Sequence, residues 1–308
     1  MSTATIAATL STLGIQFLER GWLSANNSVF VGKKGPTAVV DTGYGAHASQ
    51  TLSLVRHALN GRPLNHIVNT HLHSDHCGGN ALLAEHYPDA RIWIPPGQWE
   101  AVQQWDPVAL TYQPTGQECP PFAAHQRLLP GATIELGDWA WEIHAAPGHD
   151  PHSVVLFQPD HRCLISADAL WENGFGVVFP ELEGEQAFDD VSVTLELIRN
   201  LRPAVVIPGH GRVFTDVSAA LDRAASRLAQ FQSNPDAHLR YALKVLIKYR
   251  LLEWQQIEFQ DLHRWAEVTP YLAAHMPSDN TENWLKNLLN DLQRSGALRR
   301  EGSLILNT

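Results

Sequence analysis

The stretch NTHLHSDHCGG, at residues 69 to 79, concentrates side chains that can bind a transition metal. His71 and His73 are one residue apart, so in an extended segment their imidazoles point to the same side and can hold one ion. Asp75 and His76 come after a change of chain direction, which favours a second position. Imidazole and carboxylate together suit Zn, Mn or Fe about equally. The pattern therefore predicts one half of a metal site.

Three later segments also read as a buried strand that ends at a possible ligand. WAWEIHAAPGHD predicts a strand followed by His149, CLISADAL a strand that ends at Asp168, and AVVIPGHG a strand followed by His210. The run LNHIVNT predicts the strand before the first cluster. Loops at strand ends are a usual place for function on a rigid scaffold. We expect the four strand ends to converge on one sheet edge.

These seven side chains are enough for two neighbouring metal ions. They divide into a three-histidine group (His71, His73, His149) and a mixed group (Asp75, His76, His210). Asp168 has two carboxylate oxygens and could bridge both ions. Two bridged ions, typically ~3.5–4 Å apart, can lower the pKa of a shared water toward ~7. The sequence therefore predicts a dinuclear centre that activates water.

The motif THLHSDH resembles the His-x-His-x-Asp-His signature of the metallo-β-lactamase fold superfamily. The resemblance covers about residues 15 to 215 and includes VVDTG (39 to 43), PGH (147 to 149) and PGHG (208 to 211). It implies an α/β (α+β) fold, a four-layer αβ/βα sandwich with the dinuclear site at one edge. By position it implies the ligand sets His71, His73, His149 and Asp75, His76, His210, with Asp168 bridging. We expect two divalent ions, zinc before manganese or iron.

The residue at the bridging position bears on the reaction. True zinc β-lactamases of this fold lack an acidic bridge, whereas Asp168 resembles the thioesterase (glyoxalase II-like), lactonase, phosphodiesterase and nuclease branches. We expect a metal-dependent hydrolase of a small ester, thioester or lactone, with Asp75 holding and accepting the proton. The main alternative is a phosphodiesterase or endoribonuclease with the same centre. A mononuclear iron oxygenase and a DNA-binding regulator are further alternatives.

Several residues beside the motifs have less certain roles. Asp41 in VVDTG is expected to order the loop beneath the metals, and Cys77 to pack behind the ligand loop. His144 is expected to be an ordinary sheet residue. His152 could contact substrate or an outer carboxylate, and Tyr44 could reach the pocket mouth. Their roles stay open at this point.

An aromatic segment follows the predicted bridging residue. Trp171, Phe175 and Phe179 lie in a glycine-containing loop after Asp168. They could form an apolar wall for an acyl group, or a hydrophobic lid without a ligand role. The first interpretation favours an acyl substrate over a nucleotide.

The chain of 308 residues is long enough for one large and one small domain. The patterns predict a catalytic domain at 1–235 and, with SNPDAH as a linker, a second domain at 236–308. That domain has helical spacing at 239–252, at about 258–275 and at 281–295, then a hairpin around Glu301-Gly302. In the third helix, Trp284 and the leucines share one face. This order predicts a small winged-helix-like domain.

Charge and composition restrict the partners. The net charge is -10, and residues 236–308 hold nine basic and nine acidic residues, so nucleic-acid binding is not favoured. No apolar run approaches the ~18 residues that span a membrane, and the start lacks the basic region of a secretory signal. The three cysteines cannot form a disulfide framework. We expect a cytoplasmic enzyme with a small-molecule substrate, whose second domain covers the site or forms a homodimer.

Overall fold

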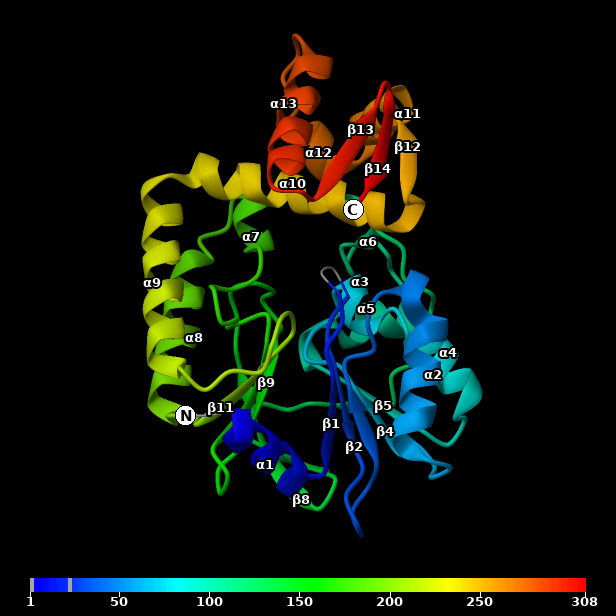
Figure 1. Ribbon diagram of the computed structural model, residues 1–308, viewed down its shortest axis with the longest axis vertical. Coiled ribbons are helices and arrows are strands. Elements are labelled where there is room, and N and C mark those ends of the chain that lie inside the picture. The colour runs from blue at the N-terminus through cyan, green and yellow to red at the C-terminus, as the bar shows by residue number, and fades with distance from the viewer. Residues whose placement is uncertain (1–2, 22–23) are drawn as a thin grey trace.

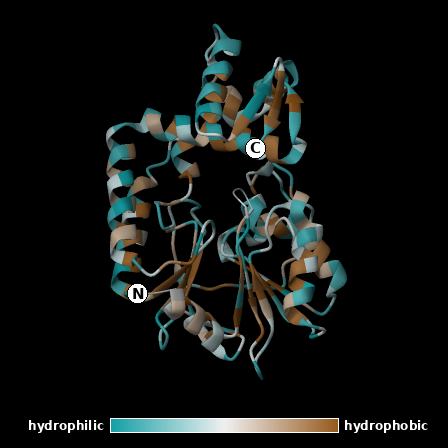
Figure 2. Ribbon diagram, in the orientation of Figure 1, coloured by the Kyte–Doolittle hydropathy of each residue, from teal (hydrophilic) through white to brown (hydrophobic). Residues whose placement is uncertain are grey.

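The described residues form a four-layer core, with two β-sheets in the middle and helices on both outer faces (Figure 1). The computed structural model describes residues 3–21 and 24–308. The strands are largely hydrophobic, whereas the outer helices carry hydrophilic residues on their exposed sides (Figure 2). Each sheet therefore buries one face against the other sheet and one face against helices. The predicted α/β sandwich is confirmed.

The first sheet has the strand order β1-β2-β3-β4-β5-β6. The bounds are Ile15–Leu18, Asn27–Phe30, Ala38–Val40, His66–Val68, Arg91–Ile94 and Gln126–Arg127. The strands from β3 to β6 run parallel, and β1 and β2 run antiparallel to their neighbours. Short apolar runs rich in Val and Ile suit strands that are buried on both faces. The strands predicted within 27–42 and 64–70 are β2, β3 and β4.

The second sheet has the strand order β11-β10-β9-β8-β7. The bounds from β7 to β11 are Thr133–Leu136, Trp139–Ala145, Val154–Gln158, Cys163–Ala167 and Val205–Pro208. The expectation that four ligand-bearing strand ends share one sheet edge is wrong, because β4 belongs to the first sheet and β8, β10 and β11 to the second. Fully buried strands have no alternation to show which sheet they join. The ligands instead meet where the edges of the two sheets face each other.

Helices and short turns connect and cover the sheets. The N-terminal helix and those beside the first sheet are α1 Thr3–Leu13, η1 Gly45–His47, α2 Ala48–Leu59, α3 Ser74–Cys77, α4 Asn80–His86, η2 Pro96–Gln98, α5 Trp99–Gln104 and α6 Tyr112–Thr115. Those beside the second sheet are α7 Phe179–Leu182, α8 Phe188–Leu201 and α9 Val217–Ser233. The helical spacing predicted at 47–60 and after Gly79 is confirmed by α2 and α4. Within the described chain, no helix is both long and apolar enough to cross a membrane.

The segment predicted as a linker is a helical corner. Helix α9 ends at Ser233, and α10 (Pro235–Trp254) begins after Asn234, whose side chain accepts a hydrogen bond from the Ala237 N–H. Asn at the N-cap and Pro in the first turn are strong helix-start signals, which explains why the chain turns here without a loop. The chain therefore passes directly from α9 into α10, and α10 lies across the end of the sandwich (Figure 1).

The C-terminal segment contains the predicted helices and hairpin. Its elements after α10 are β12 Gln256–Glu258, α11 Phe259–Val268, α12 Pro270–His275, α13 Thr281–Arg294, β13 Leu298–Glu301 and β14 Leu304–Asn307. Pro270 divides the predicted second helix, since proline cannot continue a helix ladder. The leucines of α13 are buried in their own core and Trp284 packs against it. The winged-helix interpretation and the boundary at 235/236 stay predictions.

Full-length protein is expected not to bind duplex DNA in a sequence-specific way. Helix α13 directs its apolar face inward, and its Lys286 and Arg294 pair with Glu282 and Asp291. Few cations remain to face phosphates, so a recognition helix would lack its electrostatic anchor. A gel-shift assay with random and genomic duplexes at low and high salt tests this. Tight, salt-sensitive and sequence-selective binding would contradict it.

Candidate metal centre

The ligand loop follows β4 and leads directly into the short helix α3. His71 is fully buried, His73 is half-buried, and Asp75 and His76 are buried on α3. The rings of His71 and His73 lie edge to face, with centroids 4.6 Å apart. The loop after β4 places two imidazoles, and α3 places a carboxylate and a third imidazole. The rings of His71 and His76 lie 4.0 Å apart from centroid to centroid, so the side chains before and after the start of α3 lie close together.

The three-histidine group converges on one point. His73 Nδ1 lies 2.8 Å from His149 Nε2, and His149 Nε2 lies 3.3 Å from His71 Nε2. The other nitrogen of His149, Nδ1, contacts the Val177 carbonyl oxygen. That carbonyl accepts the ring N–H, so the Nε2 lone pair is directed into the site. All three residues therefore present a ring nitrogen to the same small volume.

The mixed group lies beside the first. His210 Nε2 is 3.1 Å and His76 Nε2 is 3.7 Å from Asp75 Oδ2. Asp168 lies between the two groups, with Oδ1 3.4 Å from His76 Nε2 and Oδ2 3.4 Å from His149 Nε2. The structure thus brings all seven predicted residues together. Asp168 Oδ2 also lies 3.6 Å from His210 Nε2, so the carboxylate contacts both groups, as a bridging ligand would require.

An irregular strand end directs Asp168 into the site. The pairing of β10 with β11 shifts register between Ile165 and Ala167, and Ala167 has a φ of 46°. A non-glycine residue in the left-handed region is uncommon and often marks a functional site. Across from it, a side chain at Gly209 would place its Cβ 2.2 Å from Asp168 Oδ1. The glycine of PGHG therefore leaves the room in which this carboxylate lies.

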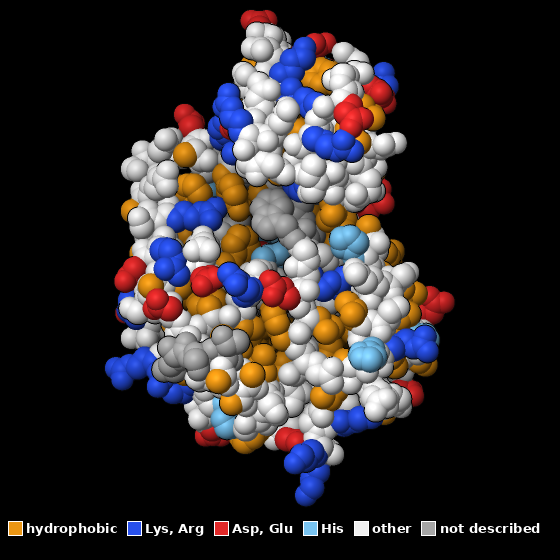
Figure 3. Space-filling view, viewed as in Figure 1, with side chains coloured by type: hydrophobic (Ala, Val, Ile, Leu, Met, Phe, Trp, Pro, Cys, Tyr) orange, Lys and Arg blue, Asp and Glu red, His pale blue; other side chains and the backbone are white. Residues whose placement is uncertain are grey.

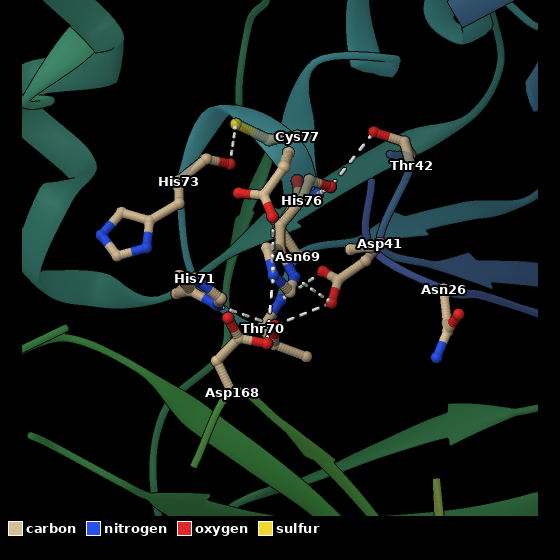
Figure 4. Close-up of polar contacts among 12 residues, drawn as sticks. Asn26, Asp41, Thr42, Asn69, Thr70, His71, His73, His76, Cys77 and Asp168 are labelled. Carbon is tan, nitrogen blue, oxygen red and sulfur yellow. Dashed lines mark hydrogen bonds and ion pairs between the residues drawn. The ribbon is translucent and has the colours of Figure 1, made fainter. Parts of the chain in front are cut away.

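Asp41 supports the ligands from beneath, as the sequence predicted (Figure 4). His76 Nδ1 donates to Asp41 Oδ2 at 2.8 Å, and the Thr70 hydroxyl donates to the same oxygen at 2.9 Å. The other oxygen, Oδ1, accepts from the Thr70 N–H at 2.9 Å. A carboxylate on the outer nitrogen of a ligating histidine fixes the ring and its tautomer. Asp41 thereby orients His76 without reaching the metal position itself.

The sequence reasoning missed residues that close the site from α10. Tyr241, Val245 and Tyr249 line the same pocket as Asp75 and Asp168. They are spaced by four residues and so share one face of the helix. Such a stripe is also typical of a core helix, and nothing in the sequence distinguishes the two cases. The structure shows that this face of α10 covers the ligands.

Two further side chains near the ligands were also missed. Gln117 lines the pocket and accepts a hydrogen bond from the Ser74 hydroxyl beside the ligand loop. Asp150 directly follows His149 and is buried, with Oδ2 3.7 Å from His73 Nε2. Burial raises the pKa of the Asp150 carboxyl. Its position after PGH was a usable signal that the sequence interpretation did not take up.

The electrostatics of the site suit cations. Burial lowers the pKa of His71 and His73 well below the ordinary value, which favours the neutral rings that bind metal. Burial also opposes charge on His76, but Asp75 and Asp168 outweigh it and raise its pKa. The described residues that line the pocket include no Lys or Arg. Carboxylates gathered here without Lys or Arg depend for positive charge on His76 and His210, whose pKa values the carboxylates raise, or on a bound cation.

Unsatisfied atoms give a second indication of a metal. Asp75 Oδ2 and His76 Nε2 are buried, and within the described chain their polar neighbours, His210 Nε2 at 3.1 Å and Asp168 Oδ1 at 3.4 Å, do not complete a hydrogen bond of good geometry. Buried polar atoms are nearly always paired, so each exception needs a cause. Both atoms point into the ligand cluster. Their chemistry, nitrogen and carboxylate oxygen, fits divalent first-row metals.

The aromatic segment after Asp168 contributes to the site in part. The ring centroids of Trp171 and His210 lie 5.3 Å apart, and those of Phe179 and His73 lie 4.9 Å apart. Both line the pocket, together with Val177. Phe175 does not, because it is buried in the core beneath α9. Trp171 and Phe179 therefore fit the interpretation as an apolar wall, whereas Phe175 has no contact with the pocket because the loop turns its side chain away.

Four residues beside the motifs lie outside the candidate ligand cluster. Cys77 is buried behind the loop, as predicted, and His144 bonds Glu142 on its own strand. Tyr44 is buried near α10 and lines a neighbouring cavity instead of the metal pocket. His152 lies outside the ligand cluster in a third cavity beside His73. Neither Tyr44 nor His152 joins the candidate ligands.

A histidine of α10 holds the loop over the site and makes stability depend on pH. His238 Nε2 accepts a hydrogen bond from the Val178 N–H at 3.1 Å. Burial, together with the charge of Arg227, lowers the pKa of His238 to about 4. A depressed pKa means that the unfolded chain takes up this proton first. Stability from this group is present above pH ~6.5 and is lost as the pH falls toward 4.

His238→Gln, which does not titrate, should therefore lose less stability in acid than the wild type. We expect the difference in unfolding free energy between the two proteins to change by about 2 kcal/mol from pH 7.5 to pH 5. Urea denaturation of the metal-loaded proteins at both pH values measures it. An unchanged difference would show that His238 is not a buried neutral acceptor.

The comparison with protein families agrees with this geometry. The profile of the Metallo-beta-lactamase superfamily matches residues 21–210. That span contains every candidate ligand from His71 to His210 and covers more than half of the chain. The chain therefore belongs to the metallo-beta-lactamase superfamily.

Individual relatives are more distant. The chain is 23% identical over 67% of its length to thioesterase pkgB of Emericella nidulans, covering 51% of that protein. It is 28% identical over 56% of its length to the acyl-coenzyme A thioesterase MBLAC2 of Gallus gallus, covering 62% of it. A metallo-beta-lactamase family protein of Thermus thermophilus, TTHA1429, shares the fold, with a TM-score of 0.57 and 20% identity over 96% of this chain and 99% of that one. The chain spans about half the length of these curated relatives.

Proposed function

We propose that the protein is a dinuclear metal-dependent hydrolase of a thioester, ester or lactone. One observation carries the proposal: the Asp168 carboxylate lies between two groups of candidate ligand atoms and contacts members of both. Membership of the superfamily supports a metal-dependent reaction. The thioesterase names of two relatives support an acyl substrate. The metal could be zinc, manganese or iron, since the donor set suits each.

The residues of this chain would act around the bound ions as follows. His71, His73 and His149 would hold one ion, and Asp75, His76 and His210 the other. Two such ions supply Lewis acidity and lower the pKa of water at the site. Asp75 would hold the attacking water and accept its proton on the carboxylate. Asp168 would fix the spacing between the two positions.

The pocket wall favours an acyl group next to the reacting carbon. Trp171, Val177 and Phe179 from the loop and Val245 from α10 line the cavity. Apolar walls with a few convergent polar groups are typical of small-molecule sites. They also exclude bulk water from the reacting carbonyl, which strengthens the electrostatic stabilisation of its developing charge. A substrate whose reacting group follows a short apolar segment fits this surface.

A screen of metal-loaded protein against thioesters, lactones, phosphodiesters and short RNA tests the proposal. Hydrolysis of the acyl substrates, lost with chelator and restored by metal, is the expected outcome. If phosphodiesters or RNA are cleaved and thioesters are not hydrolysed, the nuclease alternative replaces the proposal. Oxygen uptake with a single iron per chain would place the protein among oxygenases.

A further inference from the structure

The metal pocket is too small to contain a whole substrate. Its volume is about 30 Å³, whereas sites for drug-sized ligands typically occupy roughly 300–1,000 Å³. The reacting group alone can enter, and the rest of the substrate must lie in an adjoining hollow. Three neighbouring hollows each share lining residues with the pocket. The hollow that shares Gln117 has a volume of about 940 Å³, and the one that shares Tyr241 has about 430 Å³. The hollow that shares His73 and Phe179 has about 290 Å³.

The charges of two of these hollows disfavour an anion. The hollow at His73 is lined by Asp150, Glu183 and Glu185, with no Lys or Arg among its described lining residues. The hollow at Gln117 contains Glu118, Glu253 and Arg250, and this guanidinium already pairs with Glu253. A phosphate or carboxylate would meet net negative charge in either hollow.

The hollow at Tyr241 has the opposite character. Arg223 and Arg227 of α9 line it, together with Ser226, Gln230 and Phe231. Figure 3 shows basic side chains beside hydrophobic ones on this side of the molecule, where Figure 1 places α9. Among the described residues, neither arginine forms an ion pair with a carboxylate, in contrast to Arg199 on the adjacent α8, which pairs with Glu196 and Asp222.

The geometry of Arg227 leaves its donors available. Its guanidinium lies over the ring of Tyr241 at 4.5 Å and over that of Phe231 at 5.2 Å from Cζ to the centroid. Stacking uses the face of the guanidinium and leaves its N–H groups in the plane free for an oxyanion. Arg223 uses only Nε, which donates to the Glu172 carbonyl oxygen at 2.8 Å. Its terminal nitrogens remain for a ligand.

From these contacts we infer that the hollow lined by Arg223, Arg227 and Tyr241 is an anion subsite for the substrate of the metal centre. It takes a phosphate or carboxylate carried on the substrate away from the scissile bond, and Tyr241 borders both the subsite and the metal pocket. The inference rests on the proposed acyl hydrolysis. Paired guanidinium donors suit both anions, so the two sources have to be separated by experiment.

The test uses the metal-loaded full-length chain and two matched substrate pairs. One pair is an acyl-coenzyme A and the same acyl-pantetheine, which lacks the nucleotide phosphates. The other is glutaryl-pantetheine and valeryl-pantetheine, which differ by one carboxylate on the acyl end. In the double variant Arg223→Gln/Arg227→Gln, the ratio of kcat/KM for charged over uncharged substrate should fall about 10-fold or more in one pair. Arg199→Gln is the control and should leave both ratios unchanged.

Two results with the double variant would overturn the inference. Unchanged ratios in both pairs would show that no anion binds here. Parallel loss for charged and uncharged members would show that the arginines only hold the 172–174 loop, which Arg223 and Arg227 also contact. If the variant does not fold, sulfate at constant ionic strength should inhibit wild-type turnover of the charged member selectively. Equal inhibition of both members would also contradict the subsite.

A binding measurement separates this inference from the proposed function. Calorimetric titration with adenosine 3′,5′-bisphosphate and with glutarate needs no turnover. If the affinity for either probe falls by about 10-fold or more in the double variant and is unchanged in Arg199→Gln, the subsite is supported even if no thioester is hydrolysed. Equal affinity of wild type and double variant for both probes would reject the subsite and leave the metal-centred hydrolase untouched.

Discussion

Asp168→Ala is expected to have the largest effect of any single substitution, because it removes the carboxylate that faces both ligand groups. Hydrolysis should fall by more than the roughly 10–100-fold that follows loss of an outer group at a metal site. The bound metal should fall from two ions per chain toward one or none. Steady-state kinetics and elemental analysis of the same sample measure both quantities.

His152→Ala is the matched control for this prediction. His152 lies near the site but outside the ligand cluster, and only its backbone N–H is bonded to Asp150. The substitution should leave metal content unchanged and alter hydrolysis far less than Asp168→Ala. If Asp168→Ala retains its full metal content and activity, Asp168 does not bridge two ions.

Asp41→Asn should weaken metal binding and hydrolysis by roughly 10–100-fold. The carboxylate accepts the Nδ1–H of His76 and the hydroxyl of Thr70, and an amide is a weaker acceptor with no charge. The backbone does not confuse the result, because Asp41 has a φ of 55° and asparagine tolerates that region. Competition with a coloured chelator gives the metal affinity.

Asp138→Asn is a useful comparison for the same chemical change. Asp138 is an exposed aspartate that accepts N–H groups of Lys33, Lys34 and Gly35, and it lies at the opposite end of β8 from His149. It should change metal affinity little. Equal affinities for Asp41→Asn and wild type would show that the carboxylate does not tune His76.

The clustering of the seven candidate ligands could be predicted from sequence because each has a local signal. His71, His73, Asp75 and His76 fall within six positions after an apolar run, and Asp168 directly follows a strand. Strand ends are rigid and open, so chemistry-bearing residues there are informative. The assignment of β4 to the other sheet could not be predicted, since buried strands of both sheets have the same apolar pattern.

The cover and the proposed anion subsite could not be predicted in this way. Tyr241 and Tyr249 follow His210 by more than 30 residues and have the spacing of any core helix. Arg223 and Arg227 have the i, i+4 spacing of an exposed helix face, which usually only contacts solvent. These arginines lie beside Tyr241 because α9 turns directly into α10 at Asn234. The sequence at this turn resembles a linker, so the turn could not be predicted.

Stepwise return of metal to the stripped protein tests the central claim most directly. The chelator-treated chain is titrated with Zn²⁺, and in parallel with Mn²⁺ and Fe²⁺, while thioester hydrolysis and bound metal are recorded. We predict almost no activity without metal and full activity as occupancy approaches about two ions per chain, because seven ligands with one shared carboxylate suit two sites. Full hydrolysis without metal, or saturation at one iron accompanied by oxygen consumption, would contradict a dinuclear hydrolase.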